Sequence, residues 1–123
     1  MIVADTDVLI DFLEGRGAAD RVLAELDSGR LATTVINRYE LLAGARTKPQ
    51  RKAVEDLLAY VSTLPLDESA SDRAAETWRD LDVAGLRIGM ADCLIAGIAL
   101  HHQAALLTRN QRHFSRVAGL VLA

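Results

Sequence analysis

The chain has 123 residues, of which 50% are hydrophobic and 25% are charged, and a formal net charge of −3. This composition excludes a disordered chain, and the negative balance excludes a protein whose whole surface binds nucleic acid. The length predicts one domain over residues 1–123, since domains cluster near about 100–150 residues.

No apolar run approaches the roughly 20 residues that cross a bilayer, and the first residues do not show a basic stretch followed by an apolar core and a small-residue cleavage site. Cys93 is the only cysteine, so an internal disulfide is impossible. A reducing compartment suits this cysteine usage, and we expect a cytoplasmic protein without membrane contact.

The first predicted elements are a strand and a helix that meet at two acids. Ile2-Val3-Ala4 is a short apolar run that predicts a buried strand, and it ends abruptly at Asp5. A helix is expected to follow to about Leu13. Asp7 lies nearer to its start and suits the N-cap better than Asp5 does.

The spacing of the hydrophobic residues predicts the remaining elements, and glycine and proline mark where they begin or end. Five further helices are expected, one ending at 28–29 and the others over 35–45, 49–61, 68–84 and 90–100. Short apolar runs predict strands over 31–34, 62–66 and 104–107. In the helix over 68–84, the positions expected to be buried are Ala75, Trp78, Leu81 and Val83.

Strands that alternate with helices, without hairpin signals, predict an α/β fold with a central parallel sheet and helices on both faces. Ligand sites in such sheets form beyond the carboxyl ends of the strands. Asp5 and Thr108 both follow predicted strands directly. The sequence therefore indicates a polar site at this edge.

Two further acids lie on apolar helices. Glu40 has mostly apolar or small neighbours one turn away, and Asp92 is the only ionisable side chain in the interior of the helix over 90–100. Burying a carboxylate costs free energy that a cation or hydrogen bonds must offset. Simpler interpretations remain open: helix capping for Asp5 and Asp92, and an ion pair to Arg38 or Arg46 for Glu40.

Three acids on separate elements are harder to explain as independent accidents, and we expect their oxygens to face one pocket that seats a divalent ion. Mg²⁺ and Mn²⁺ prefer oxygen ligands and can activate water against a phosphodiester. No glycine-rich phosphate loop, nucleophile elbow or Cys-His pair competes with this chemistry. Basic residues that could flank the site, or simply face solvent, are Arg46-Lys48-Arg51-Lys52 and Arg109-Arg112-Arg116.

Four segments, in order, resemble PIN domains, and specifically the VapC toxins of bacterial toxin–antitoxin pairs. They are DTDVLID at 5–11, NRYELLAG at 37–44, ADCLIA at 91–96 and LTRNQRHF at 107–114. Each motif alone is weakly specific, whereas all four in this order are specific. The resemblance covers essentially the whole chain.

The resemblance implies a three-layer α/β/α sandwich and an endoribonuclease that depends on Mg²⁺ or Mn²⁺. It also implies a homodimer that a cognate VapB antitoxin neutralises, in a heterotetramer or larger complex. The residues that it assigns to the metal and to catalysis are Asp5, Glu40 and Asp92. The residues that it implies as supporting residues of the same site are Thr6, Asp7, Thr108 and Asn110. The candidates for RNA contact are Arg46, Arg109 and Arg112.

Two positions depart from the family's usual pattern. Asp7 stands where Asn or Ser is common and adds a charge beside Asp5. His113 stands where a fourth acid is common, which puts a second metal ion in doubt. For His113 itself, exposure to solvent is favoured over a metal-binding or phosphate-binding role.

Two alternatives belong to other classes. A haloacid-dehalogenase-like phosphohydrolase would use Asp5 as a nucleophile with Asp7 as an acid, but it needs a late lysine, and the only lysines are Lys48 and Lys52. A catalytically silent PIN-like binding module would keep the acids without binding metal. The replacement at His113 gives this second alternative some weight.

Overall fold

Four short strands form one parallel sheet in the order β3-β2-β1-β4 in the computed structural model, which describes residues 1–123. The strands are β1 (Ile2–Ala4), β2 (Leu31–Thr34), β3 (Ser62–Leu64) and β4 (Ala105–Leu107). Because β2 and β4 pair with opposite sides of β1, the carboxyl ends of these three strands lie together at one edge.

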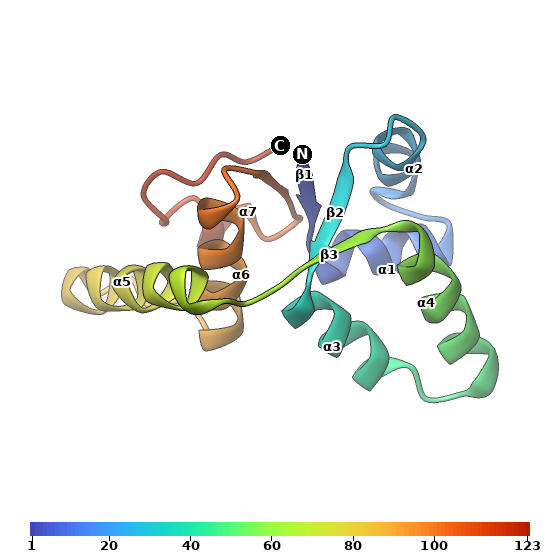
Figure 1. The fold of residues 1–123 in the computed structure, drawn as a ribbon, viewed down its shortest axis with the longest axis horizontal. Helices are drawn as coiled ribbons and strands as arrows, with labels where there is room; N and C mark the ends of the chain where they lie inside the picture. Colours follow the sequence, from blue (N-terminus) through green and yellow to red (C-terminus); the bar gives the residue numbers. More distant parts are fainter.

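Helices cover both faces of this sheet (Figure 1). One face carries α1 (Thr6–Glu14), α2 (Ala19–Asp27) and α4 (Lys48–Tyr60), and the other carries α5 (Glu68–Ala84), α6 (Met90–His101) and α7 (Gln111–Phe114). Helix α3 (Val35–Gly44) continues from β2 beyond the edge of the sheet. The predicted three-layer α/β/α sandwich with a central parallel sheet is therefore confirmed.

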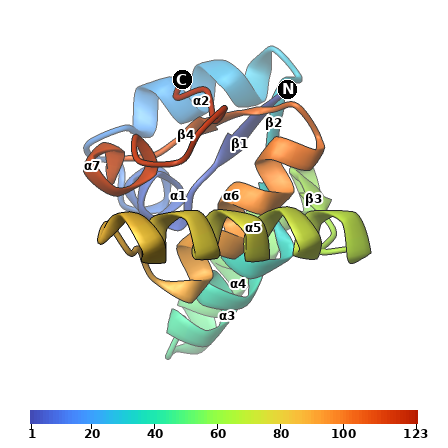
Figure 2. The ribbon, with the colours of Figure 1, turned by 90° about the vertical axis from the view of Figure 1, so that its left-hand side faces the viewer.

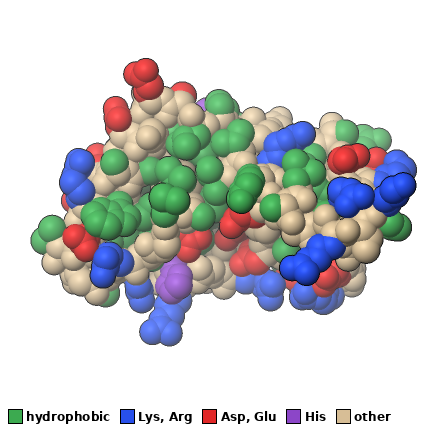
Figure 3. Space-filling view, turned by 90° about the horizontal axis from the view of Figure 1, so that it is seen from below, with side chains coloured by type: hydrophobic (Ala, Val, Ile, Leu, Met, Phe, Trp, Pro, Cys, Tyr) green, Lys and Arg blue, Asp and Glu red, His purple; other side chains and the backbone are tan.

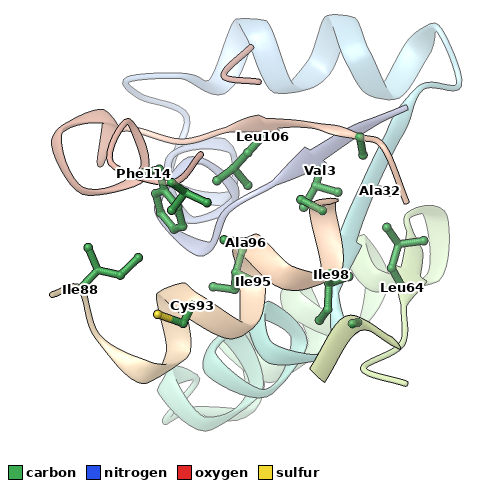
Figure 4. Close-up of a cluster of buried hydrophobic side chains, with 14 of the residues drawn as sticks. Val3, Ala32, Leu64, Ile88, Cys93, Ile95, Ala96, Ile98, Leu106 and Phe114 are labelled. Atoms are coloured by element: carbon green, nitrogen blue, oxygen red, sulfur yellow. The ribbon is translucent and has the colours of Figure 1, made fainter. Parts of the chain in front are cut away.

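The two faces of the sheet have separate hydrophobic cores. Helix α6 occupies the centre of one core, where Ile95 and Ile98 are almost fully buried beside Val3 and Leu106 of the sheet (Figure 4). This burial agrees with the prediction that the helix is packed on several sides. None of the helices combines the length and the apolar character that a bilayer crossing needs.

The buried face of α5 differs from the predicted one. Trp78 is 40% exposed and Val83 is 90% exposed, and Ala75 also lies at the surface. Leu81 is buried as predicted, and the other buried residues of the helix are Ala70, Ala74 and Thr77. The helix lies directly against α6 (Figure 2), and such close contact needs small side chains rather than large ones.

Three local details also differ from the sequence prediction. Asp5, not Asp7, caps α1, because its side chain accepts the hydrogen bond from the Thr6 backbone. The short helix α7 was not predicted, since four residues show no period. Strand β3 ends at Leu64 rather than Leu66.

Gly97→Ala should destabilise the protein, because a Cβ there would lie 2.6 Å from the backbone oxygen of Ala70 and 2.8 Å from the Ala74 Cβ. Helix α5 would have to move, and we expect the free energy of unfolding to fall by about 3 kcal/mol. Urea denaturation measures this change. Gly44→Ala is the matched control, since its Cβ would meet no atom within 4 Å; equal losses in both variants would contradict the close α5–α6 contact.

Candidate active site

The polar side chains predicted from the sequence gather where three neighbouring strands end. Asp5 follows β1, Thr34 ends β2, and Thr108 follows β4. The chain crosses from one side of β1 to the other between β3 and β4, so this edge is the switch point in strand order, where ligand sites form in α/β sheets. Viewed from this edge, acidic side chains gather near the middle of the face, with a histidine and several Lys or Arg side chains around them (Figure 3).

Asp5 is held by donors from three segments of the chain. Its Oδ1 accepts hydrogen bonds from the Thr6 backbone at 2.8 Å and from Asn37 Nδ2 at 2.9 Å. Its Oδ2 accepts one from Thr108 Oγ1 at 2.7 Å. With an exposed fraction of 7%, this carboxylate is nearly closed to solvent. The simple capping interpretation therefore covers only one of its contacts.

Glu40 joins the same network through Thr6. Thr6 Oγ1 donates to Glu40 Oε1 at 2.6 Å, and Asn37 Nδ2 lies 2.9 Å from the same hydroxyl. The alternative of an ion pair to Arg38 or Arg46 is wrong, because no Lys or Arg side chain pairs with Glu40.

Asp7 contributes a carboxylate that the protein only half satisfies. Its Oδ2 accepts a hydrogen bond from the Arg109 backbone at 3.1 Å and lies 3.4 Å from Thr108 Oγ1. Its Oδ1 is buried and has no hydrogen-bond partner. Because buried polar atoms are rarely left unpaired, this oxygen is a position where a cation or water fits.

Asp92 reaches the site through the segment that follows β4. Its Oδ2 lies 3.8 Å from His113 Nδ1, which lies 3.1 Å from Asn110 Nδ2. The Asn110 backbone donates to Thr108 Oγ1 at 3.0 Å, and Thr108 contacts Asp5. His113 therefore lies beside an acid of the site, while 43% of its side chain is exposed to solvent.

The acids influence one another electrostatically. Burial raises the pKa of Asp5 to about 6, the hydrogen bond from Thr108 opposes this rise, and the charges of Asp7 and Asp92 add to it. Burial also raises the pKa of Asp92, His113 opposes the rise, and Glu40 and Asp7 add to it. Four carboxylates thus share one neighbourhood, and the ion pairs of the protein join His113 to Asp92 but no Lys or Arg side chain to any of the four.

The structure nevertheless corrects one geometric expectation. No three Asp, Glu, His or Cys side chains come close enough together to form a ready-made set of metal ligands. Asp5, Glu40 and Asp92 line one region, as predicted, but their oxygens do not converge on a single point. Any ion held here would complete its shell with water.

Asn37 is the functional candidate to which the sequence reasoning gave no role. It is fully buried, Thr34 Oγ1 donates to its Oδ1 at 2.7 Å, and its amide group contacts both Asp5 and Thr6. Its position three residues after the threonine that caps α3 was the available signal. A buried amide beside an acid motif indicates a supporting role rather than packing.

The candidates for RNA contact lie in different settings. Arg46 is exposed in the loop between α3 and α4, and Arg112 is exposed on α7, and neither forms an ion pair. Arg109 Nε instead lies 3.2 Å from Asp11 Oδ2. One nitrogen of its guanidinium group therefore pairs within the protein, while 54% of the side chain is exposed.

Comparisons with known proteins agree with this architecture. The family model described as "PIN domain" matches residues 2–120. Ribonuclease VapC10 of Mycobacterium tuberculosis is 38% identical over 115 residues, which cover 93% of this chain and 86% of that protein. The tRNA(fMet)-specific endonuclease VapC of Shigella flexneri is 28% identical over 120 residues, covering 94% and 91% of the two chains.

Solved structures give the same result. VapBC-1 from nontypeable Haemophilus influenzae matches with a TM-score of 0.86 and 28% identity, over 100% of this chain and 97% of that one. VapBC2 from Rickettsia felis, bound to a DNA fragment from its promoter, has a TM-score of 0.89 at 22% identity, which supports the fold alone. The chain therefore belongs to the PIN-domain family, within its VapC ribonuclease group. This result confirms the resemblance and overturns the phosphohydrolase alternative.

Asp5→Asn should stabilise the metal-free protein at neutral pH. The Asp5 pKa is about 6 in the folded chain against an ordinary value of 3.8, so the ionised carboxylate opposes folding above pH 6 by up to about 3 kcal/mol. The parent protein regains this stability as the pH falls through 6 towards 3.8.

Urea denaturation with a chelator, near pH 7.5 and near pH 5, measures the effect. The advantage of Asp5→Asn over the parent should shrink at the lower pH. Asp72→Asn, at an exposed position of α5, controls for the loss of one negative charge. An advantage that stays constant or grows towards pH 5 would show that burial does not strain the Asp5 carboxylate.

Proposed function

We propose that this chain is a metal-dependent endoribonuclease that acts as the toxin of a VapBC-type toxin–antitoxin pair. One observation carries the proposal: Asp5, Asp7, Glu40 and Asp92 lie together at the carboxyl edge of the sheet, and no lysine or arginine side chain forms an ion pair with any of them. Such a concentration of carboxylates is electrostatically unfavourable unless a cation accompanies it. We also infer that residues 1–123 are a single domain, because the family match spans 2–120.

The residues present fit Mg²⁺ or Mn²⁺. Asp5, Glu40 and Asp92 would hold the ion, and the unpartnered Asp7 Oδ1 adds a further oxygen nearby. Mg²⁺ commonly takes only one or two carboxylates and keeps several waters, which suits side chains that do not converge on one point. The bound ion would supply an activated water and neutralise charge on the phosphate oxygens.

The protein's own groups prepare this chemistry by orientation. Thr108 holds Asp5 Oδ2, and Asn37 and the Thr6 backbone hold Asp5 Oδ1, which fixes the carboxylate plane. The Thr6 hydroxyl holds Glu40 in turn. The exposed guanidinium groups of Arg46 and Arg112 are free to bind RNA phosphates.

Partners follow from the solved relatives, which include VapBC assemblies and a toxin–antitoxin complex from Klebsiella pneumoniae. We propose a cognate VapB-type antitoxin, a homodimer, and a heterotetramer or larger complex between them. Every side chain of the acid site comes from one copy of the chain.

Asp5→Asn and Asp92→Asn should each lower the rate of RNA cleavage in Mn²⁺ or Mg²⁺. We expect losses of more than roughly 100-fold, beyond the 10–100-fold typical of residues that only support metal ligands. A chelator should abolish the activity of the parent. Asp72→Asn is the control and should cleave RNA like the parent, whereas persistent cleavage in both site variants would end the nuclease proposal.

Isothermal titration with Mn²⁺ separates the nuclease from a catalytically silent binding module. We expect the parent to bind Mn²⁺ and both site variants to bind it more weakly, because each loses an ionised oxygen ligand. Circular dichroism checks that the variants remain folded. A folded parent that binds no Mn²⁺ and cleaves no RNA would favour the silent module.

Expression of the chain alone should slow bacterial growth, because unrestrained RNA cleavage depletes functional RNA. Growth should recover when Asp92→Asn replaces the parent at equal protein level, or when the cognate antitoxin is expressed with it. Growth curves with immunoblots measure this effect. Equal toxicity of parent and Asp92→Asn would contradict a role for the acid site in toxicity.

A further inference from the structure

A second buried carboxylate, Asp11, lies on α1 outside the group of four acids. Its exposed fraction is 0%, and it is contacted by groups of two segments, the loop between α1 and α2 and the residue Arg109. Arg16 Nη1 lies 2.8 Å from Asp11 Oδ1, the Ala18 backbone donates to Oδ2 at 3.0 Å, and Arg109 Nε lies 3.2 Å from Oδ2. An uncompensated buried charge would cost much folding free energy, so these contacts are what allows Asp11 to be buried.

The loop between α1 and α2 is shaped around this carboxylate. Gly17 has φ 56°, and a Cβ at that position would lie 2.3 Å from Asp11 Oδ2. Only glycine allows both this backbone conformation and this close approach. Asp11 is therefore a fixed point on α1 against which another segment can be anchored.

Arg109 is anchored to α1 at two places one helical turn apart. Its backbone N–H donates to Asp7 Oδ2 at 3.1 Å, and its side chain pairs with Asp11. The neighbouring residues complete the acid site: Thr108 donates to Asp5 at 2.7 Å, and the Asn110 backbone donates to Thr108. Whatever fixes Arg109 therefore also fixes the Thr108 hydroxyl against Asp5.

We propose that Asp11 is a positioning residue for RNA cleavage, which holds the segment 108–110 in register with the acids through Arg109. The inference rests on the proposed function for its catalytic consequence. It gives Arg109 a positioning role, because the Nε of its guanidinium group pairs with Asp11. Arg112, without an ion-pair partner, keeps the RNA-contact role.

Arg109 is a better position for testing this proposal than Asp11. In Arg109→Gln the buried Asp11 retains Arg16 and the Ala18 backbone as donors, so the fold should persist. Asp11→Asn would leave two arginines and a backbone donor without their charged acceptor and risks unfolding. Arg109→Lys keeps one positive charge within reach of Asp11.

Steady-state cleavage of a short RNA distinguishes positioning from RNA binding. We expect Arg109→Gln to lower kcat by roughly 10- to 100-fold, as small misplacements of reacting groups do, with KM changed by less than about twofold. Arg109→Lys should restore part of the loss. Arg112→Gln should instead raise KM, and Arg79→Gln, an exposed arginine on α5, should match the parent.

A raised KM with unchanged kcat in Arg109→Gln would overturn the proposal and make Arg109 an RNA contact. Unchanged kinetics in Arg109→Gln would overturn it equally.

Amide hydrogen exchange tests the same idea without any activity. In Arg109→Gln, the backbone amides of residues 109 and 110 should exchange at least about tenfold faster, because the segment 108–110 is held less firmly against α1. The Ala18 amide, bonded to Asp11 directly, should keep its protection and is the internal control. Unchanged exchange at 109 and 110 would refute the positioning role, even if the parent proved not to cleave RNA.

Discussion

The carboxylate of Asp5 is the constraint on which the rest of the site depends. It is buried where β1 ends, and its hydrogen bonds come from α1, α3 and the residue after β4. These donors favour the ionised form, yet burial and neighbouring acids still raise its pKa to about 6. The protein thus builds a negative site that it does not neutralise itself. Stability given up at such a position is commonly the cost of function.

The sheet and helices provide the precision that this site requires. β1, β2 and β4 have only three or four residues each and pair in parallel, so the polar residues that follow them start from neighbouring points of one sheet. Behind the site, α6 brings Asp92 forward from a core in which Gly97 touches α5. Asp7 and Asp11, on α1, hold the segment 108–110 in place through Arg109. The hydrophobic cores on the two faces of the sheet therefore both position the residues at its carboxyl edge.

Element types and the parallel sheet could be predicted from the sequence, because the strands are apolar runs and the helices have clear periods. The acids Asp5, Glu40 and Asp92 were predictable from carboxylates in apolar surroundings, although their roles remain predictions. The hydrogen-bond partners of these acids could not be predicted, because the bonds join residues far apart in sequence. Thr6 and Glu40 are 34 positions apart, and Thr108 and Asp5 are 103 positions apart. The buried face of α5 was missed because large apolar residues such as Trp78 suggested a core that the close approach to α6 excludes.

The outer side of β4 has a consequence for how copies of this chain can associate. Leu106 donates its N–H to the Val121 carbonyl, and its own carbonyl accepts from Ala123, so residues 121–123 pair with this edge strand. Unpaired edge strands invite pairing with strands of other molecules. With β4 covered, only β3, at the far side of the sheet from Thr108, has a free edge. Edge-to-edge pairing of the sheets of two copies would therefore use β3 and leave β1 and β4, which carry site residues, untouched.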